Sequence, residues 1–129
     1  MSLVLVDSSV WIAYFRGSMK AELLDQDIET NRICINELIL SELLPSIRLK
    51  KENDLAELLE TVEKLPLKIN WEEIRNIQLK NLKRGINKVG IPDLIIFQNA
   101  IQNGVTLLTL DNHFSLMAEL SECKVTLLT

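Results

Sequence analysis

The segment that most constrains the fold of this chain is residues 3–12, in which a short apolar run ends on an acidic residue. Residues 3–6 are all apolar, and a run of this length is typical of a strand that is buried on both faces of a parallel sheet. Asp7 ends the run and is followed by Ser8 and Ser9. In open α/β sheets this carboxyl edge is where ligands bind, although any of the three residues could simply cap the next helix.

Short apolar runs alternate with helical patterns along the rest of the chain. Further strands are expected at residues 32–35, 67–69, 105–109 and 124–128. In the first half of the chain, helices are expected at residues 10–15, after a cap at Ser18 with Leu23, Leu24 and Ile28 buried, and from a cap at Asn36 to a break or bend at Pro45. In the second half, they are expected at residues 53–65 and 70–83. Two more are expected from Pro92 as first residue to a stop at Gly104, and through Phe114 and Met117. Strands joined by helices of about ten residues indicate crossover connections. The sequence therefore predicts one α/β domain over residues 1–129, with three layers and a mostly parallel central sheet.

The composition is that of a chain with a substantial core, because 47% of its 129 residues are apolar. No apolar run approaches the roughly 20 residues that a membrane span requires, and no secretory signal is present, so we expect a cytoplasmic protein without membrane contact. Cys34 and Cys123 have neither metal-site nor disulfide-framework spacing and are expected as free, packed thiols. The net charge of −4 gives no overall attraction to nucleic acid. It does not exclude such a substrate, because a cluster of acids around metal ions can dominate the sum.

Four carboxylates occupy comparable places in the predicted elements: Asp7 and Asp111 follow strands, Asp93 opens a buried helix and Glu42 interrupts an apolar helical run. Each has a simpler explanation, as a helix cap, as a charge that complements a helix N-terminus, or as a residue on the solvent-exposed face of its helix. Together they are expected at one edge of the sheet, where they would repel one another unless a cation lies among them. Oxygen ligands favour Mg²⁺ or Mn²⁺, and the single His113 cannot make a zinc site. Such a site suits hydrolysis of phosphodiesters by a metal-activated water.

Four blocks of the sequence resemble, in order, those of PIN-domain ribonucleases and, more narrowly, of VapC-type toxins: residues 5–12, 40–44, 90–96 and 108–114. The resemblance spans almost the whole chain. It implies a PIN-like α/β/α fold, Mg²⁺-dependent endoribonuclease activity, a cognate antitoxin protein as partner and a homodimer.

The resemblance also assigns roles to individual positions. Asp7, Glu42, Asp93 and Asp111 match the acidic quartet of the family, with Asp7 and Asp93 as the best candidates for direct metal ligands. Glu42 and Asp111 would bind the metal directly, hold its waters or complete a second site. Ser9 and Thr109 match positions where the family often has supporting hydroxyls, and Asn112 is a weaker candidate for support. Glu37 is the nearest rival of Glu42, but its place at a helix start already explains it. The chain departs from many relatives at Phe97 and Gln98, where small residues are common, and this puts local packing in doubt.

Two groups of basic side chains are candidates for binding RNA phosphates. Lys80, Lys83, Arg84 and Lys88 precede the block at residues 90–96, and Arg16 follows the first block. The alternative is an ordinary solvated helix face.

Other functional classes fit the same acids less well. A receiver-type phosphoacceptor domain needs paired acids after the first strand and a lysine after the last, but Ser8 follows Asp7 and only Thr129 follows Leu128. A haloacid-dehalogenase-like phosphatase needs a second Asp where Ser9 stands. A catalytically silent PIN-like binding module remains an alternative, which the presence of all four acids disfavours.

Overall fold

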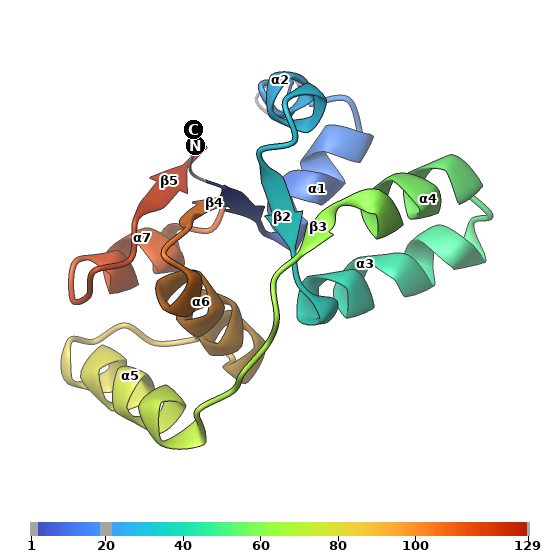
Figure 1. The fold of residues 1–129 in the computed structure, drawn as a ribbon. Helices are drawn as coiled ribbons and strands as arrows, with labels where there is room; N and C mark the ends of the chain where they lie inside the picture. Colours follow the sequence, from blue (N-terminus) through green and yellow to red (C-terminus); the bar gives the residue numbers. More distant parts are fainter. Residues whose placement is uncertain (1–2, 19–21, 129) are drawn as a thin grey trace.

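The computed structural model describes residues 3–18 and 22–128 and is built around a parallel five-stranded sheet. Its strands are β1 (Val4–Val6), β2 (Ile33–Ile35), β3 (Glu63–Lys64), β4 (Thr106–Thr109) and β5 (Val125–Leu127), in the order β3-β2-β1-β4-β5 (Figure 1). Every pairing is parallel, and β1 lies at the centre with Val4 opposite Ile33 and Val6 opposite Leu108. The carboxyl ends of β1 and β4 therefore meet at the same edge.

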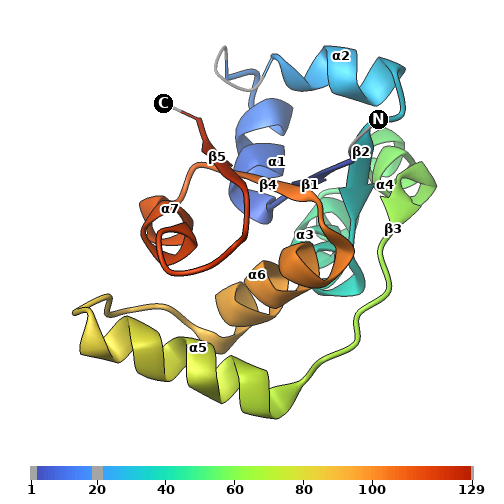
Figure 2. The same ribbon diagram turned by 60° about the vertical axis from the view of Figure 1, so that its left-hand side comes forward.

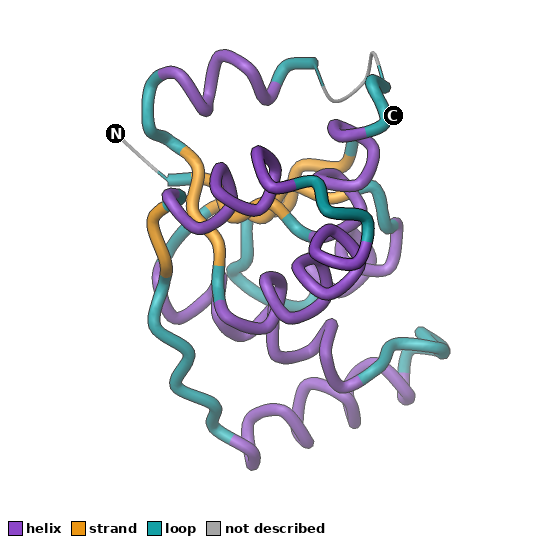
Figure 3. Tube along the Cα trace, turned by 90° about the vertical axis from the view of Figure 1, so that its right-hand side faces the viewer, coloured by secondary structure: helices purple, strands orange, loops and turns teal. Residues whose placement is uncertain are grey.

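Helices cover the sheet on both sides, as the tube in Figure 3 shows. In the described residues they are α1 (Ser8–Phe15), α2 (Leu24–Glu29), α3 (Glu37–Leu49), α4 (Asn53–Thr61), α5 (Trp71–Lys83), α6 (Ile91–Asn103) and α7 (Asn112–Ala118). Figures 1 and 2 place α5 on the outside of α6, away from the strands. The predicted three-layer α/β fold with a central parallel sheet is confirmed. No described helix combines the length and the apolar character that crossing a bilayer would take.

Helix α6 is the most deeply buried helix, because seven consecutive residues, from Leu94 to Ala100, are shielded from solvent. Phe97 is 1% exposed and stacks on Phe114 with ring centroids 6.5 Å apart. Burial of an aromatic side chain of this size stabilises a fold by about 1.5–3 kcal/mol. Gln98, also buried, donates to the backbone carbonyl of Asn70 at 3.0 Å and accepts from its N–H at 3.2 Å. The departure at Phe97 and Gln98 is therefore accommodated by an aromatic stack and by hydrogen bonds to the segment before α5.

The connection between α4 and α5 differs from the prediction. Helix α4 ends at Thr61, and the third strand is Glu63–Lys64, so the helix predicted through residue 65 and the strand predicted at residues 67–69 are both wrong. Val62 and Leu65 fit a helical spacing, but the open edge of β2 offers backbone partners, and the N–H of Leu65 donates to the carbonyl of Ile35 at 2.8 Å. The chain then runs without regular structure, and its carbonyls accept hydrogen bonds from side chains of α6, namely Asn99 to Pro66 and Gln102 to Lys68.

Three helix boundaries also differ. Pro45 does not break α3, which continues to Leu49. Helix α2 begins at Leu24 with Leu23 as its N-cap, so Ser18 does not cap it, and Leu23 is 73% exposed rather than buried. Pro92 is the second residue of α6, because Gly90 is the N-cap.

Cys34 and Cys123 are free and buried, as predicted. Burial raises the pKa of the Cys34 thiol to about 12 and that of Cys123 to about 11. Both therefore pack as neutral thiols.

Candidate functional site

Asp7 is the most tightly held of the four acids. It is 4% exposed at the end of β1 and caps α1, where its Oδ1 accepts hydrogen bonds from the backbone N–H groups of Ser9 at 2.8 Å and Val10 at 3.3 Å. The same oxygen accepts from Ser9 Oγ, and Oδ2 accepts from Thr109 Oγ1, each at 2.5 Å. The capping role and the position at the carboxyl edge of the sheet therefore hold at the same time.

Two hydroxyls join the end of β1 to the end of β4. Ser9 Oγ accepts from the N–H of Leu110 at 3.2 Å, and Thr109 Oγ1 accepts from the N–H of Asp111 at 2.9 Å while it donates to Asp7. The residues predicted as supports, Ser9 and Thr109, thus contact the acid that they were expected to support. Asn112 is exposed and makes no side-chain hydrogen bond within residues 3–18 and 22–128, so the structure does not bring it into this cluster.

Asp111 lies beyond β4 and caps α7. Its Oδ1 accepts from the N–H of His113 at 2.9 Å and contacts His113 Nδ1 at 2.8 Å. The Asp111 carboxyl is 35% exposed, and the only histidine of the chain thus lies beside the acids.

Glu42 and Asp93 come from helices α3 and α6 rather than from strand ends. Partial burial raises the pKa of Glu42, and the negative charges of Asp93 and Asp7 raise it further, while a hydrogen bond with Ser8 lowers it. Partial burial also raises the pKa of Asp93, with further increases from the charges of Asp111 and Asp7 and decreases from a backbone hydrogen bond at Gly90 and from His113. These mutual effects show that the four predicted acids share one region at the carboxyl edge of the sheet.

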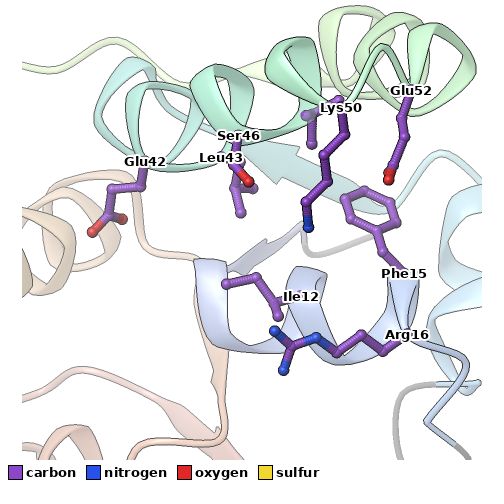
Figure 4. Close-up of a pocket in the computed structure, with 9 residues that line it drawn as sticks. Ile12, Phe15, Arg16, Glu42, Leu43, Ser46, Lys50 and Glu52 are labelled. Atoms are coloured by element: carbon purple, nitrogen blue, oxygen red, sulfur yellow. The ribbon is translucent and has the colours of Figure 1, made fainter.

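The carboxylates share this region without forming a closed cage. In the part of the chain that the structure describes, no group of three or more His, Cys, Asp or Glu side chains is arranged to hold a metal ion. The hydrogen bonds of Asp7 fix its orientation, whereas Glu42 is exposed and extends from α3 toward α6 (Figure 4). Glu37, the rival of Glu42, is exposed in the first turn of α3, where a negative charge favours the helix dipole.

The family model of the PIN domain matches residues 4–120. The chain belongs to the PIN-domain family. The predicted resemblance to this family is therefore confirmed over most of the chain. A search among curated proteins finds no match by sequence.

Solved structures share the PIN fold along the full length of this chain. A chain in the crystal structure of VapBC2 from Rickettsia felis bound to a promoter DNA fragment has a TM-score of 0.75 at 16% identity, covering 98% of this chain and 99% of its own. A chain in DNA-bound VapBC from Salmonella typhimurium has a TM-score of 0.74 at 21% identity, covering 100% of both chains. A chain of VapBC-5 from Mycobacterium tuberculosis has a TM-score of 0.67 at 18% identity, covering 98% and 99%. At identities this low, the structural similarity establishes a common fold and nothing more.

The basic residues predicted to bind RNA lie in two separate parts of this PIN domain. Arg16 lines a cavity with Glu42 between α1 and α3 (Figure 4). Lys80, Lys83, Arg84 and Lys88 are exposed at the end of the peripheral helix α5 and in the loop after it. The structure therefore places only Arg16 in a cavity that includes one of the four acids.

Two residues near the acids were not anticipated from the sequence. Lys50, at the C-cap of α3, lines the same cavity as Glu42 and Arg16, and Ser8 is a hydrogen-bond partner of Glu42. The spacing of residues 42, 46 and 50 places them on one helix face and was a signal that could have revealed Lys50. No comparable signal links Ser8 to Glu42, because they come from different helices.

Proposed function

We propose that this PIN domain is a metal-dependent endoribonuclease and the toxin of a VapBC-type toxin–antitoxin pair. The observation that carries the proposal is the meeting of Asp7, Glu42, Asp93 and Asp111 at one sheet edge, where partial burial and then the charges of neighbouring acids raise the pKa values of Glu42 and Asp93. A carboxylate that lies alone on the surface has no neighbouring acid to raise its pKa. A cation between them would relieve the repulsion.

The donor set fits a hard divalent cation, Mg²⁺ or Mn²⁺, because all four acids supply oxygen. Asp7 and Asp93 would hold it directly, and Glu42 and Asp111 would bind it, hold its waters or complete a second site. A bound divalent ion lowers the pKa of its water and neutralises charge on a phosphodiester. Because no trio of acids is grouped for a metal in the described residues, binding would bring the carboxylates closer together than they are in this structure.

The supporting hydroxyls and the carboxyls on the helices have different roles in binding the cation. Ser9 and Thr109 hold Asp7 in one orientation, so this ligand needs no rearrangement. Because the pKa values of Glu42 and Asp93 are raised, protons compete with the cation for these carboxylates up to a higher pH than they would at ordinary carboxyls. Binding is therefore expected to strengthen as pH rises.

The proposed partners are an RNA substrate, a cognate antitoxin and a second copy of the chain, in the cytoplasm. The fold likeness to chains of VapBC structures supports the antitoxin. Co-purification with any small protein that is encoded beside this chain tests the antitoxin, and size-exclusion chromatography with mass measurement tests the homodimer. Recovery of a lone monomer from the co-expressed pair would contradict both.

A receiver-type phosphoacceptor is less consistent with this structure. Ser8, in the position of the second acid, is a hydrogen-bond partner of Glu42, and β5 ends at Leu127 without a following lysine. A catalytically silent module is distinguished from a nuclease by the experiment below.

The deciding experiment incubates the purified protein with an RNA pool in Mg²⁺ or in EDTA. Asp7→Asn and Asp93→Asn are compared with Glu119→Gln, which removes one negative charge from an exposed position outside the cluster. We expect cleavage only with Mg²⁺, and a loss in both Asp variants above the roughly 10–100-fold that is typical when a group supporting a metal ligand is removed. Cleavage that EDTA does not reduce would indicate a contaminating nuclease, and no cleavage by the wild type would favour the silent module.

The basic end of α5 has its own test. Lys83→Glu together with Arg84→Glu is expected to weaken RNA binding and to lessen its salt dependence if these side chains contact phosphates. Unchanged binding across salt concentrations would leave them as a solvated helix face.

A further inference from the structure

Two buried amides join the helices that carry Glu42 and Asp93. Asn36, the N-cap of α3, is 0% exposed, and Asn99 of α6 is 1% exposed. The Nδ2 of Asn36 donates to the Oδ1 of Asn99 at 2.9 Å. The two residues are 63 positions apart in the chain, so this hydrogen bond links α3 directly to α6.

The orientation of each amide is fixed by a second partner. The Oδ1 of Asn36 accepts from the backbone N–H of Ile39 at 2.8 Å, which leaves its Nδ2 to face Asn99. The Nδ2 of Asn99 donates to the carbonyl of Pro66 at 2.9 Å, which leaves its Oδ1 to face Asn36. Turning either amide over would replace two favourable contacts by two repulsive ones. The pair therefore favours one position of α3 against α6.

The stability of the core does not by itself call for a polar pair at this place. Two apolar side chains of the same shape would fill the space at little cost, because a buried amide gives up its hydrogen bonds to water. A fully satisfied buried hydrogen bond also specifies a unique arrangement of the elements that it joins. The pair is therefore best explained by what depends on the position of α3 against α6.

The amides and the acids have matching spacings on the two helices. Glu42 follows Asn36 by six residues, and Asp93 precedes Asn99 by six residues. At about 1.5 Å per residue, each acid lies about 9 Å along its helix from the amide. Figure 4 shows Glu42 extending from α3 toward α6, and the negative charge of Asp93 raises the pKa of Glu42. The helices therefore pass each other in opposite chain directions, with the amides at one point and the acids at another.

The helix segments between the amides and the acids are closely packed. Ile39, three residues after Asn36, is 0% exposed, and Ile96, three residues before Asn99, is 2% exposed. Close-packed interiors transmit a displacement rather than absorb it. A shift of α3 at the amide pair would therefore move the two acids relative to each other.

We propose that the hydrogen bond between Asn36 and Asn99 positions Glu42 opposite Asp93 and thereby raises the affinity of the acidic cluster for a divalent cation. The two asparagines are positioning residues, because they act through the helices. The inference rests on the proposed function and adds two residues to its cation site. The acids repel each other in the cation-free protein, and the amide pair holds their helices together against this repulsion.

The test compares Mn²⁺ binding by the wild type and by Asn36→Ser. A serine at the N-cap still accepts from the N–H of Ile39, but its side chain is too short to reach Asn99. Titration followed by the EPR signal of free Mn²⁺ gives the dissociation constant without any measurement of cleavage. We expect this constant to rise about 10- to 100-fold, the range that is typical for groups that orient a metal ligand.

Two controls separate this effect from the general consequences of the substitution. Asn70→Ser makes the same change at the N-cap of α5, where the side chain accepts from the N–H of Glu73 at 3.1 Å. Asn81→Ser shortens an amide of α5 that is 1% exposed and donates to Gln78 at 3.2 Å. Because α5 carries none of the four acids, both controls should bind Mn²⁺ within about twofold of the wild type.

A double-mutant cycle tests that the two amides act as one unit. Asn99→Ala breaks the same bond from the side of α6 and should weaken Mn²⁺ binding by a similar factor. Because either substitution already breaks the bond, Asn36→Ser/Asn99→Ala should bind Mn²⁺ within about threefold of the weaker single variant. Melting curves in EDTA identify the folded variants, and either single variant tests the bond if the other does not fold.

Equal Mn²⁺ dissociation constants in the wild type, Asn36→Ser and Asn99→Ala would overturn the proposal and leave the pair as part of the core. It would also fail if Asn81→Ser weakened binding as much as Asn36→Ser, or if the effects of the two single substitutions multiplied in the double variant. These results are separable from failure of the nuclease function. A wild type that binds Mn²⁺ without cleaving RNA would contradict the nuclease alone, and one that binds no Mn²⁺ would contradict the cation site and this inference with it.

Discussion

The acids that follow strands and the acids on helices form two contrasting halves of the candidate site. Asp7 is buried and accepts hydrogen bonds from Ser9, Val10 and Thr109, and the Thr109 hydroxyl continues to the backbone of Asp111. Glu42 and Asp93 are more exposed, and partial burial together with neighbouring charges raises their pKa values. Hydrogen-bond donors of the protein satisfy Asp7, whereas no ion pair of the described residues neutralises Glu42 or Asp93.

This difference indicates how an acidic site can fold before its cation arrives. Hydroxyl and N–H donors offset part of the free-energy cost of burying the Asp7 carboxylate, so that β1, α1 and β4 can assemble around it. The repulsion falls on side chains at the periphery of the cluster, where solvent reduces its effect. The two halves should therefore respond to mutation in opposite directions.

The largest expected effect is on the free energy of unfolding of the metal-free protein, which two substitutions should change in opposite directions. Asp7→Ala removes the N-cap of α1 and leaves the Thr109 hydroxyl without its acceptor, so we expect a loss of about 2–4 kcal/mol in the free energy of unfolding. Asp93→Asn keeps an acceptor for the first turn of α6 and removes one repelling charge, so its stability should rise slightly. Urea unfolding in EDTA measures both, and destabilisation of similar size in the two variants would contradict the contrast.

The second prediction adds the cation. At a Mg²⁺ concentration about 100 times its dissociation constant, the wild type should gain about 2.7 kcal/mol of stability, because the ion binds the folded protein preferentially. Asp93→Asn should show a much smaller gain, while Glu119→Gln, the surface control, should match the wild type. Melting temperatures across a Mg²⁺ titration measure this, and equal shifts in all three proteins would place the ion elsewhere.

A smaller effect is expected at the link between the two strands. Thr109→Val keeps the shape of the buried side chain but removes both the donor to Asp7 and the acceptor for the Asp111 N–H, at about 1–3 kcal/mol of stability. Cleavage should also fall about 10–100-fold, as is typical for groups that orient a metal ligand. Thr126→Val, at an exposed position of β5, is the matched control. Full activity with an unchanged melting temperature would show that Asp7 needs no such support.

The smallest effect concerns pH. Because the folded-state pKa values of Glu42 and Asp93 lie above 4.5 and 3.8, these groups favour folding at low pH, and the contribution is lost as pH rises through the raised values. The stability advantage of Asp93→Asn over the wild type should therefore be near zero at the lowest pH and grow toward neutrality in EDTA. Melting curves between pH 4 and pH 7 give this difference, and an advantage that shrinks with rising pH would contradict the raised pKa of Asp93.

Much of the fold was readable from local patterns. The apolar runs before Asp7 and Asp111 are strands, Asn36 caps α3 as predicted, and α5 begins directly after Asn70, where a helix was expected. Asp111 caps α7, which is the simpler role that the sequence also allowed. Besides the three helix boundaries, the prediction fails in the stretch after α4, where Val62 and Leu65 suit a helix and an edge strand equally well. The open edge of β2 decided between them, and that edge lies far away along the chain.

The sequence by itself determined the alternation of strands and helices and the identity of the four acids, because both depend on residue type and on spacing along the chain. Only the tertiary structure decided that Thr109 donates to Asp7, that Ser8 meets Glu42, and that Arg16 and Lys50 line one cavity. The physical reason is that these contacts join elements whose separation depends on how the helices pack on the sheet. Periodicity predicts the buried side of a helix, but the packing of whole elements decides which side chain of another element it meets.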